Sequence, residues 1–292
     1  MRTNYALRRK EAMVGLAFIL PSLAGIAVFV LIPFADAVRR SVTQGFTGVF
    51  MGFKYYLEIF VNASFKTALV NTGRFMIICV PLLLVLSLIV AIMLSGKVRG
   101  RNALRASFLV PMAIPVASVA LLWQLLFHQN GLINVALGAL GLTKVDWMGS
   151  NASLFCLIIS YIWKNIGYTM VLFIAGLSGI SQSLYEAASV DGAGPAKQFF
   201  SITLPCLLPT LFTVTVLSLL NTFKAYREAY LVAGSYPQGS IYLVQHTLNN
   251  WFSKLEIEKL SAAAVVIAMM ILALVVLLNK AWNRDQRAAG PF

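Results

Sequence analysis

The chain has 292 residues, of which 59% are hydrophobic and only 11% are charged. Soluble globular domains contain about a quarter charged residues, so this composition excludes an ordinary soluble domain and indicates a protein embedded in a lipid bilayer. The net charge of +13 would suit a nucleic-acid-binding protein, but the cations lie mostly beside apolar runs, where they set the orientation of membrane helices. We therefore expect no nucleic-acid partner.

Six apolar stretches are long enough to cross a membrane as helices, because about 20 mostly apolar residues span roughly 30 Å of hydrocarbon. The sequence predicts an all-α, polytopic membrane protein with one transmembrane domain over residues 1–292. The predicted helices cover residues 13–37, 68–94, 106–127, 153–177, 206–230 and 260–282.

The first apolar stretch imitates a secretory signal, since Arg8, Arg9 and Lys10 precede it. The run is longer than a signal core of about 7–15 residues and contains Pro21 and Pro33, so we interpret it as an uncleaved first helix. If the N-terminus is cytoplasmic, the inner segments hold more Lys and Arg than the outer ones, as the positive-inside rule requires. Both termini are then predicted to be cytoplasmic.

The longest outer loop covers residues 39–66 and has an amphipathic, aromatic-rich part that includes Phe53, Tyr55 and Tyr56. Aromatic side chains favour the headgroup region, so this part is predicted to form an interfacial helix. A docking surface for an external solute-binding protein is the alternative. The three cysteines, Cys79, Cys156 and Cys206, all lie in apolar stretches, and their odd number and wide spacing predict neither a disulfide framework nor a metal site.

Charged residues within the predicted helices need an explanation, because a charge at a helix centre costs roughly 2.5–3.5 kcal/mol on insertion scales. Lys224 and Glu228 are four residues apart on one helix face and could pair. Arg227 has only apolar neighbours at that spacing, so it needs water, a cavity or a partner chain. The ionisable residues in or beside the spans are Arg74, Lys164, Lys224, Arg227 and Glu228.

Two interpretations of this polar region remain open. The fifth helix could leave the hydrocarbon near Phe223, which would place the charges at the outer interface. Alternatively, the region lines a hydrated path, since polyols need hydrogen-bond donors and acceptors beside aromatic faces. The candidate path residues are Asn165, Tyr168, Asn221, Lys224, Tyr226, Arg227 and Glu228.

Residues 183–205 form a polar segment between two apolar runs. Alanine and glutamate favour a short helix over residues 186–190, and the run from Gly192 to Pro195 ends it. A second helical turn over residues 196–203 and Pro205 then lead into the next apolar helix. Small side chains on one face, together with two carboxylates, suit docking into a groove on a soluble partner. The candidate docking residues from this reasoning are Glu186, Ala187, Ala188, Asp191 and Ala193.

The spacing of Glu186-Ala187-Ala188, Asp191-Gly192-Ala193, Ile202 and Pro205 closely resembles the EAA signature of the integral-membrane subunits of binding-protein-dependent ABC importers. In that family the segment is the cytoplasmic coupling helix, which sits in a cleft of the ATPase subunit, so the resemblance adds Gly192, Ile202 and Pro205 to the candidate docking residues. Residues 162–168 and 172–177 look like the carbohydrate branch of the family, the relatives of the maltose permease subunits. The resemblance covers most of the chain and implies a type I ABC importer permease fold in a bacterial or archaeal cytoplasmic membrane.

The resemblance also implies a function: a permease subunit of an ATP-driven importer for a sugar, an oligosaccharide or a related polyol, forming half of the translocation path. The chain has no Gly-x-x-x-x-Gly-Lys-Ser/Thr loop, so ATP and Mg²⁺ are expected on two separate ATPase subunits, and this chain is expected to be no enzyme and to hold no cofactor. A sister permease chain, in a heterodimer, and an extracytoplasmic solute-binding protein are the other implied partners. A permease for a polyamine or a phosphorylated polyol is the nearer alternative. A membrane-embedded enzyme is the remote one.

Overall fold

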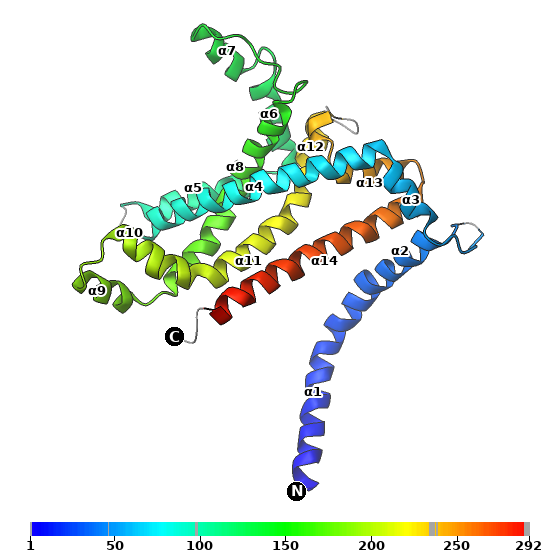
Figure 1. Ribbon diagram of the computed structural model, residues 1–292, viewed down its shortest axis with the longest axis horizontal. Helices are drawn as coiled ribbons and strands as arrows, with labels where there is room; N and C mark the ends of the chain where they lie inside the picture. The colour runs from blue at the N-terminus through cyan, green and yellow to red at the C-terminus, as the bar shows by residue number, and fades with distance from the viewer. Residues whose placement is uncertain (1, 46, 97–98, 234–236, 238, 289–292) are drawn as a thin grey trace. The chain divides into compact units, whose positions relative to one another are not determined.

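The computed structural model describes residues 2–45, 47–96, 99–233, 237 and 239–288 (Figure 1). Every regular element in these ranges is helical, and an isolated β-bridge joins Thr43 and Phe50. The all-α, six-span prediction is confirmed, because the described residues contain six helical stretches that are long and apolar enough to cross a membrane. They are Ala12–Val42, Ala63–Ser95, Val116–Ala139, Ser153–Ser178, Pro195–Tyr230 and Ile257–Lys280.

The contacts divide the chain into two units, and unit 1 comprises Met1–Asn62 and Trp251–Leu272. The first span in this unit is built from α1 (Arg2–Ile26), a π-helical turn (Ala27–Leu31) and α2 (Ile32–Val42). Pro33 lies in the first turn of α2 and lacks an N–H, so the wider turn before it lets the helix continue past the proline. The unit also holds α3 (Lys54–Val61) and the first part of α14 (Ile257–Ala288).

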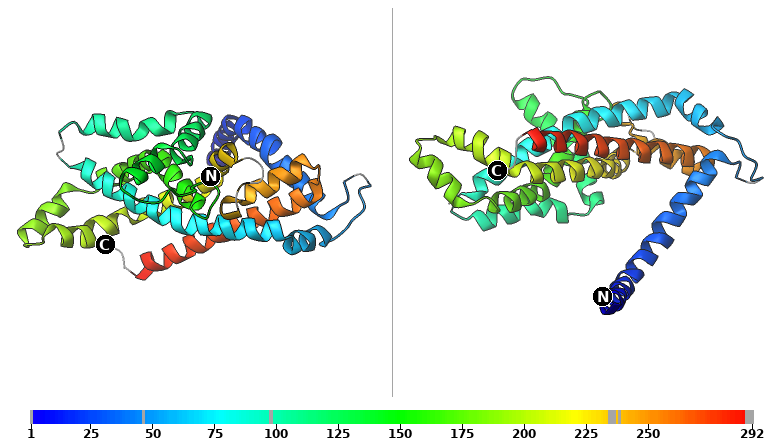
Figure 2. Two further views of the ribbon diagram at one scale, coloured as in Figure 1. Left: turned by 90° about the horizontal axis from the view of Figure 1, so that it is seen from above. Right: turned by 60° about the horizontal axis from the view of Figure 1, so that its bottom comes forward.

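Unit 2 comprises Ala63–Asn250 and Ala273–Phe292. At its centre α4, α8 and α11 pack against one another, α5 packs along α8, and α12 packs against α6 (Figures 1 and 2). Its helices are α4 (Ala63–Ser95), α5 (Arg101–Ala113), α6 (Val116–Phe127), α7 (Leu132–Ala139), α8 (Ser153–Ser178), α9 (Gln182–Val190), α10 (Pro195–Gln198), α11 (Leu204–Thr222), α12 (Tyr226–Ala233) and most of α13 (Val244–Ser253).

Two glycines allow α8 to approach its neighbours closely. A Cβ atom on Gly167 would overlap the backbone carbonyl of Phe108 in α5, and one on Gly176 would meet Thr210 in α11. Small residues at helix crossings are typical of membrane proteins, where close packing replaces the hydrophobic driving force between helices. These two glycines therefore fix the helix arrangement that positions the polar residues of α8.

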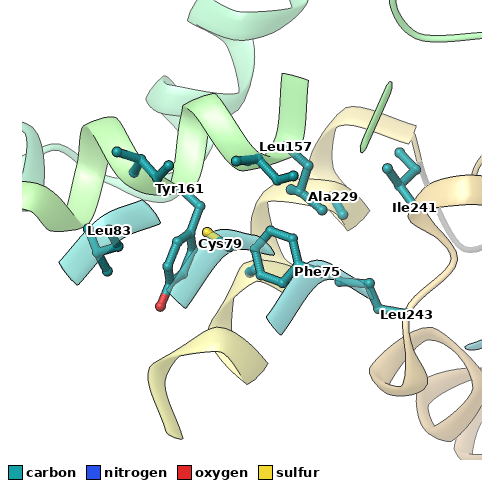
Figure 3. Close-up of a cluster of buried hydrophobic side chains, with 11 residues drawn as sticks. Phe75, Cys79, Leu83, Leu157, Tyr161, Ala229, Ile241 and Leu243 are labelled. Carbon is teal, nitrogen blue, oxygen red and sulfur yellow. The ribbon is translucent and has the colours of Figure 1, made fainter. Parts of the chain in front are cut away.

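A buried apolar cluster joins α4 to α8 in unit 2 (Figure 3). The rings of Phe75 and Tyr161 meet edge to face, with centroids 5.4 Å apart, a favoured aromatic geometry. Figure 3 shows the Tyr161 ring beside Cys79, with its hydroxyl oxygen pointing away from the cluster. The ring of Tyr161 thus packs α8 against α4, while its hydroxyl group points away from the apolar cluster.

Two of the predicted helices are wrong as single helices. The stretch 106–127 is divided into α5 and α6 at Ile114 and Pro115, because the residue before a proline is forced into an extended conformation, and Ile114 has ψ 130°. The stretch 206–230 is divided by a 3₁₀ turn, Phe223–Ala225, between α11 and α12. The helices predicted at 68–94, 153–177 and 260–282 are continuous as α4, α8 and α14, and each extends further than expected.

Candidate functional site

The coupling segment, residues 183–205, has a local structure that follows from its own residues. Helix α9 contains Glu186, Ala187 and Ala188, and it ends where Gly192 adopts φ +74°. The N–H of Gly192 donates to the carbonyl of Ser189 at 3.1 Å, and the N–H of Ala193 donates to the carbonyl of Ala188 at 2.8 Å. These two bonds with a left-handed residue form a Schellman motif, which requires glycine or asparagine at position 192.

The second half of the coupling segment is tied back to the first. Pro195 opens α10 after Gly194, and the side chain of Gln198 donates to Ser189 Oγ and to the carbonyl of Ala193, both at 3.0 Å. The hydroxyls of Tyr185 and Thr203 are hydrogen-bonded at 2.8 Å. Figures 1 and 2 show α9 and α10 together at one end of unit 2, between α8 and α11. The segment is therefore a small, internally bonded body.

The predicted docking residues lie on an open surface. Glu186, Ala187, Asp191, Gly192 and Pro205 are exposed, whereas Ala188, Ala193 and Ile202 are half-buried. Apolar side chains accompany them: Val190 is 88% exposed and Phe200 is 66% exposed. In the described part of the chain, the carboxylates of Glu186 and Asp191 have no ion-pair partner. Uncovered apolar side chains beside unpaired acids are typical of a surface that binds another protein.

A polar cavity of about 320 Å³ lies within unit 2. Five of the seven predicted path residues line it: Asn165, Tyr168, Asn221, Arg227 and Glu228. The 3₁₀ turn after Thr222 redirects the chain so that α12, rather than a continuous fifth helix, presents its charged side chains to the cavity. The sequence missed four further lining residues, Met112, Val116, Tyr161 and Lys164, of which only Lys164 carried a signal, as a cation within an apolar helix.

Two of the residues that line this cavity form an ion pair. Lys164 Nζ in α8 lies 2.8 Å from Glu228 Oε1 in α12, and the two side chains are only 13% and 10% exposed. From helical spacing alone, Glu228 could pair with Lys224, although the order of the two residues is the less favourable one. The structure shows an ion pair between Glu228 and Lys164 of α8, and the side chain of Lys224 lies outside the described residues. The carboxylate is thus held by a residue 64 positions away in the chain.

Two polar atoms near this pair have no hydrogen-bond partner among the described residues. They are Glu228 Oε2 and the Tyr161 hydroxyl, and both are buried. A buried polar atom without a partner carries the full cost of its lost hydration. Both residues line the cavity, but these two atoms are themselves covered, so each side chain has to rotate slightly before a hydroxyl group in the cavity can reach it.

The remaining predicted path residues have different surroundings. Arg227 lines the cavity, is exposed, and has no acidic partner in the described ranges. Tyr226 is not among the lining residues, since its ring packs against His246 with centroids 4.7 Å apart and against Tyr230 at 5.4 Å. His246 is fully buried, and burial lowers its pKa to about 4, so this ring is neutral and structural at ordinary pH. No group of three or more potential metal ligands occurs among the described residues.

Comparisons with known proteins give a consistent result. A family model described as "Binding-protein-dependent transport system inner membrane component" matches residues 83–284. The trehalose/maltose transport system permease protein MalF of Thermococcus litoralis is 31% identical over 280 residues, which cover 94% of this chain and 95% of that protein. The sn-glycerol-3-phosphate transport system permease protein UgpA of Yersinia pestis is 30% identical over 89% of this chain and 90% of its own length.

Solved structures share the fold. A chain from a bacterial ABC transporter involved in the import of the acidic polysaccharide alginate superposes with a TM-score of 0.82, covering 97% of this chain and 99% of that chain at 22% identity. A second structure of a bacterial alginate transporter, in complex with a periplasmic protein bound to an alginate pentasaccharide, gives a TM-score of 0.81. The expected ABC importer permease fold is confirmed.

Proposed function

We propose, because this chain belongs to the family of binding-protein-dependent transport system inner membrane components, that it is the permease subunit of an ATP-driven ABC importer for a sugar, an oligosaccharide or a related polyol. The chain is a multi-pass protein of the cytoplasmic membrane. The solute class follows its relatives, which are named for trehalose and maltose and for sn-glycerol 3-phosphate.

The coupling segment is the observation that carries the proposal. Its exposed apolar side chains and acids are typical of a docking surface. Its Schellman motif and side-chain hydrogen bonds hold its short helices in a fixed arrangement. We infer that α9 sits in a cleft of an ATPase subunit on the cytoplasmic side, where both termini of this chain also lie. Closure of two ATPase subunits around ATP and Mg²⁺ would push this body and switch the spanning helices between inward-open and outward-open states.

We infer that further subunits complete the importer. The sequence has no Gly-x-x-x-x-Gly-Lys-Ser/Thr loop for phosphates, so the proposal assigns no catalysis and no cofactor to this chain. One chain supplies six spans, and we infer a sister permease as the second half of the path, in a heterodimer. An extracytoplasmic binding protein would deliver the solute. We infer that the cavity of unit 2 is the part of the translocation path that this chain provides.

The polar lining of the cavity supports a polyol rather than a polyamine. Its residues offer both hydrogen-bond donors and acceptors, which hydroxyl groups can use in either direction. A polyamine would bring several positive charges close to Arg227, and like charges repel each other. Arg227 therefore argues against the polyamine alternative.

The coupling role is tested by substitutions that change the segment without touching the helix core. Glu186→Lys reverses a charge on the proposed contact, and Gly192→Val forces a β-branched residue into φ +74°. We expect both variants to lower solute uptake at least about tenfold, because docking contacts near an interface centre commonly contribute about 2 kcal/mol. Membrane abundance should stay near normal. Copurification of the ATPase subunit with this chain is the direct measurement.

Two matched variants serve as controls. Gly192→Asn should retain coupling, since asparagine tolerates left-handed backbone angles. Glu256→Lys makes the same charge reversal at a residue outside the coupling segment, residues 183–205, and should leave ATPase copurification intact. If Glu186→Lys and Gly192→Val both retain uptake and ATPase copurification, the docking role of this segment is wrong.

A further inference from the structure

We propose that the cavity of unit 2 selects polyhydroxylated solutes that carry a negative charge, as a phosphate or a carboxylate, over neutral sugars. This inference rests on the proposed function, since it assigns a solute class to the cavity that an importer would use as its path. It is carried by the charges that line the cavity and by the buried polar atoms that have no partner.

The charges do not balance within the cavity. Three charged side chains line it, Lys164, Arg227 and Glu228. Lys164 and Glu228 neutralise each other at 2.8 Å, and the side chain of Arg227 has no acidic partner in the described part of the chain. The described lining therefore has a net charge of one positive unit, which resides on Arg227.

An arginine in this position is suited to an oxyanion. The guanidinium group is planar, is always protonated, and presents paired N–H donors that match the spacing of two carboxylate or phosphate oxygens. The side chain is exposed on the cavity side rather than packed into the core, so an incoming anion can reach it. In a site with limited hydration such a pair is stronger than in water.

A bare anion would satisfy only part of the cavity. Glu228 Oε2 is buried with no partner among the described residues, and as a carboxylate oxygen it repels an anion and requires a donor. After a small rotation of the Glu228 side chain, a hydroxyl group of the solute can supply that donor, and the Tyr161 hydroxyl, which is likewise covered, can turn to bond another oxygen of the same solute. The combination of one cation with an unpartnered acceptor and an unpartnered hydroxyl fits a polyol that bears an acid group. The volume of about 320 Å³ lies at the small end of ligand pockets, about 300–1,000 Å³, and suits one sugar-sized unit.

The test compares matched pairs of probes that differ in charge: glucuronate with glucose, and glycerol phosphate with glycerol. Binding is measured by saturation-transfer NMR on the assembled importer in lipid nanodiscs, without nucleotide and without the binding protein, so that the cavity alone is read. We expect the acidic member of each pair to bind at least about tenfold more tightly, the usual contribution of one charge-assisted hydrogen bond. Arg227→Gln should abolish this preference, and Arg227→Lys should keep part of it.

The control is Lys144→Gln, which removes the same charge from an exposed lysine outside the cavity whose side chain donates to Asn130 Oδ1. This variant should keep the full preference for the acidic probes. The inference is overturned if the neutral member of each pair binds equally well or better, if neither member binds, or if Arg227→Gln retains the preference.

The proposed function is read separately from the same preparation, as stimulation of ATP hydrolysis by the binding protein. A stimulated complex whose cavity shows no charge preference overturns the inference on charge alone. A complex with no ATPase subunit attached, or with no stimulation, overturns the proposed function itself.

Discussion

The polar cavity and the coupling segment both place acids on short helices, but the surroundings of those acids are opposite. The side chain of Glu228 in the cavity is only 10% exposed and forms an ion pair with Lys164, from a distant part of the chain. Glu186 and Asp191 in the coupling segment are exposed, and no residue of α9 or α10 is buried. The cavity depends on contacts between helices, whereas the coupling segment depends on bonds within some twenty residues.

This difference separates two kinds of mutational effect. Removing one member of the ion pair in the cavity leaves the other charge buried without its partner, so the free energy of unfolding should fall. An exposed side chain of the coupling segment contributes little to the packing of this chain. Changing it should therefore leave the free energy of unfolding almost unchanged, while binding to the partner subunit changes. Substitutions matched in chemistry and placed in both regions put this separation to the test.

The largest effect is expected for Lys164→Met. The substitution leaves the carboxylate of Glu228 buried without its counter-charge, and breaking a buried pair in this way costs about 3–5 kcal/mol. The thermal unfolding midpoint of the purified complex, followed by fluorescence-detected size exclusion, should drop strongly. On the coupling segment, Glu186→Gln should shift the stability by less than about 0.5 kcal/mol.

A double variant isolates the cause of this loss. Lys164→Met combined with Glu228→Gln removes both charges and should recover much of the stability, since no buried charge remains unpaired. A Lys164→Met protein that unfolds at the wild-type temperature would contradict a structural role for the pair.

A smaller effect is expected from two glycine-to-alanine substitutions, one at the crossing of α5 and α8 and one in the coupling segment. The new Cβ of Gly167→Ala overlaps the carbonyl of Phe108, and overpacking of this kind costs about 1–3 kcal/mol. Gly194 has φ −69° and open space where its Cβ would lie, so Gly194→Ala should change stability by at most about 0.5 kcal/mol. Unfolding midpoints measured side by side decide the matter, and equal midpoints would contradict the close approach of α5 and α8.

The elements that the sequence predicted well are those whose causes are local. Apolar length identifies a spanning helix because the bilayer demands internally bonded backbone over a fixed thickness. The coupling segment was also predictable, because Gly192 and Pro195 act on their own backbone angles. The break at Pro115 had the same kind of local signal, yet the apolar run across it favoured one continuous helix.

The elements that the sequence missed have causes that are not local. The turn Phe223–Ala225 contains neither glycine nor proline, so its own residues give no signal that α11 ends there. The pairing of Glu228 with Lys164 depends on how α8 meets α12, which helical spacing within one helix does not reveal. Tyr226 shares the polar run with Arg227 but packs against His246, a contact that depends on the path of the chain through residues 239–246.

A smaller effect than that of Gly167→Ala is expected for Tyr185→Phe, which tests a hydrogen bond within the coupling segment. The substitution keeps the ring and removes the 2.8 Å hydroxyl bond to Thr203, at a cost of about 0.5–1.5 kcal/mol. That cost falls on the position of α9 rather than on the helix core, so the unfolding midpoint should hardly move while amide hydrogen exchange in α9 rises. A looser body transmits less of the ATPase motion, so more ATP should be hydrolysed for each solute imported. Thr203→Val breaks the same bond from the other side and should give no further change when combined with Tyr185→Phe. Unchanged exchange in both single variants would show that the Schellman motif and Gln198 hold the segment without this bond.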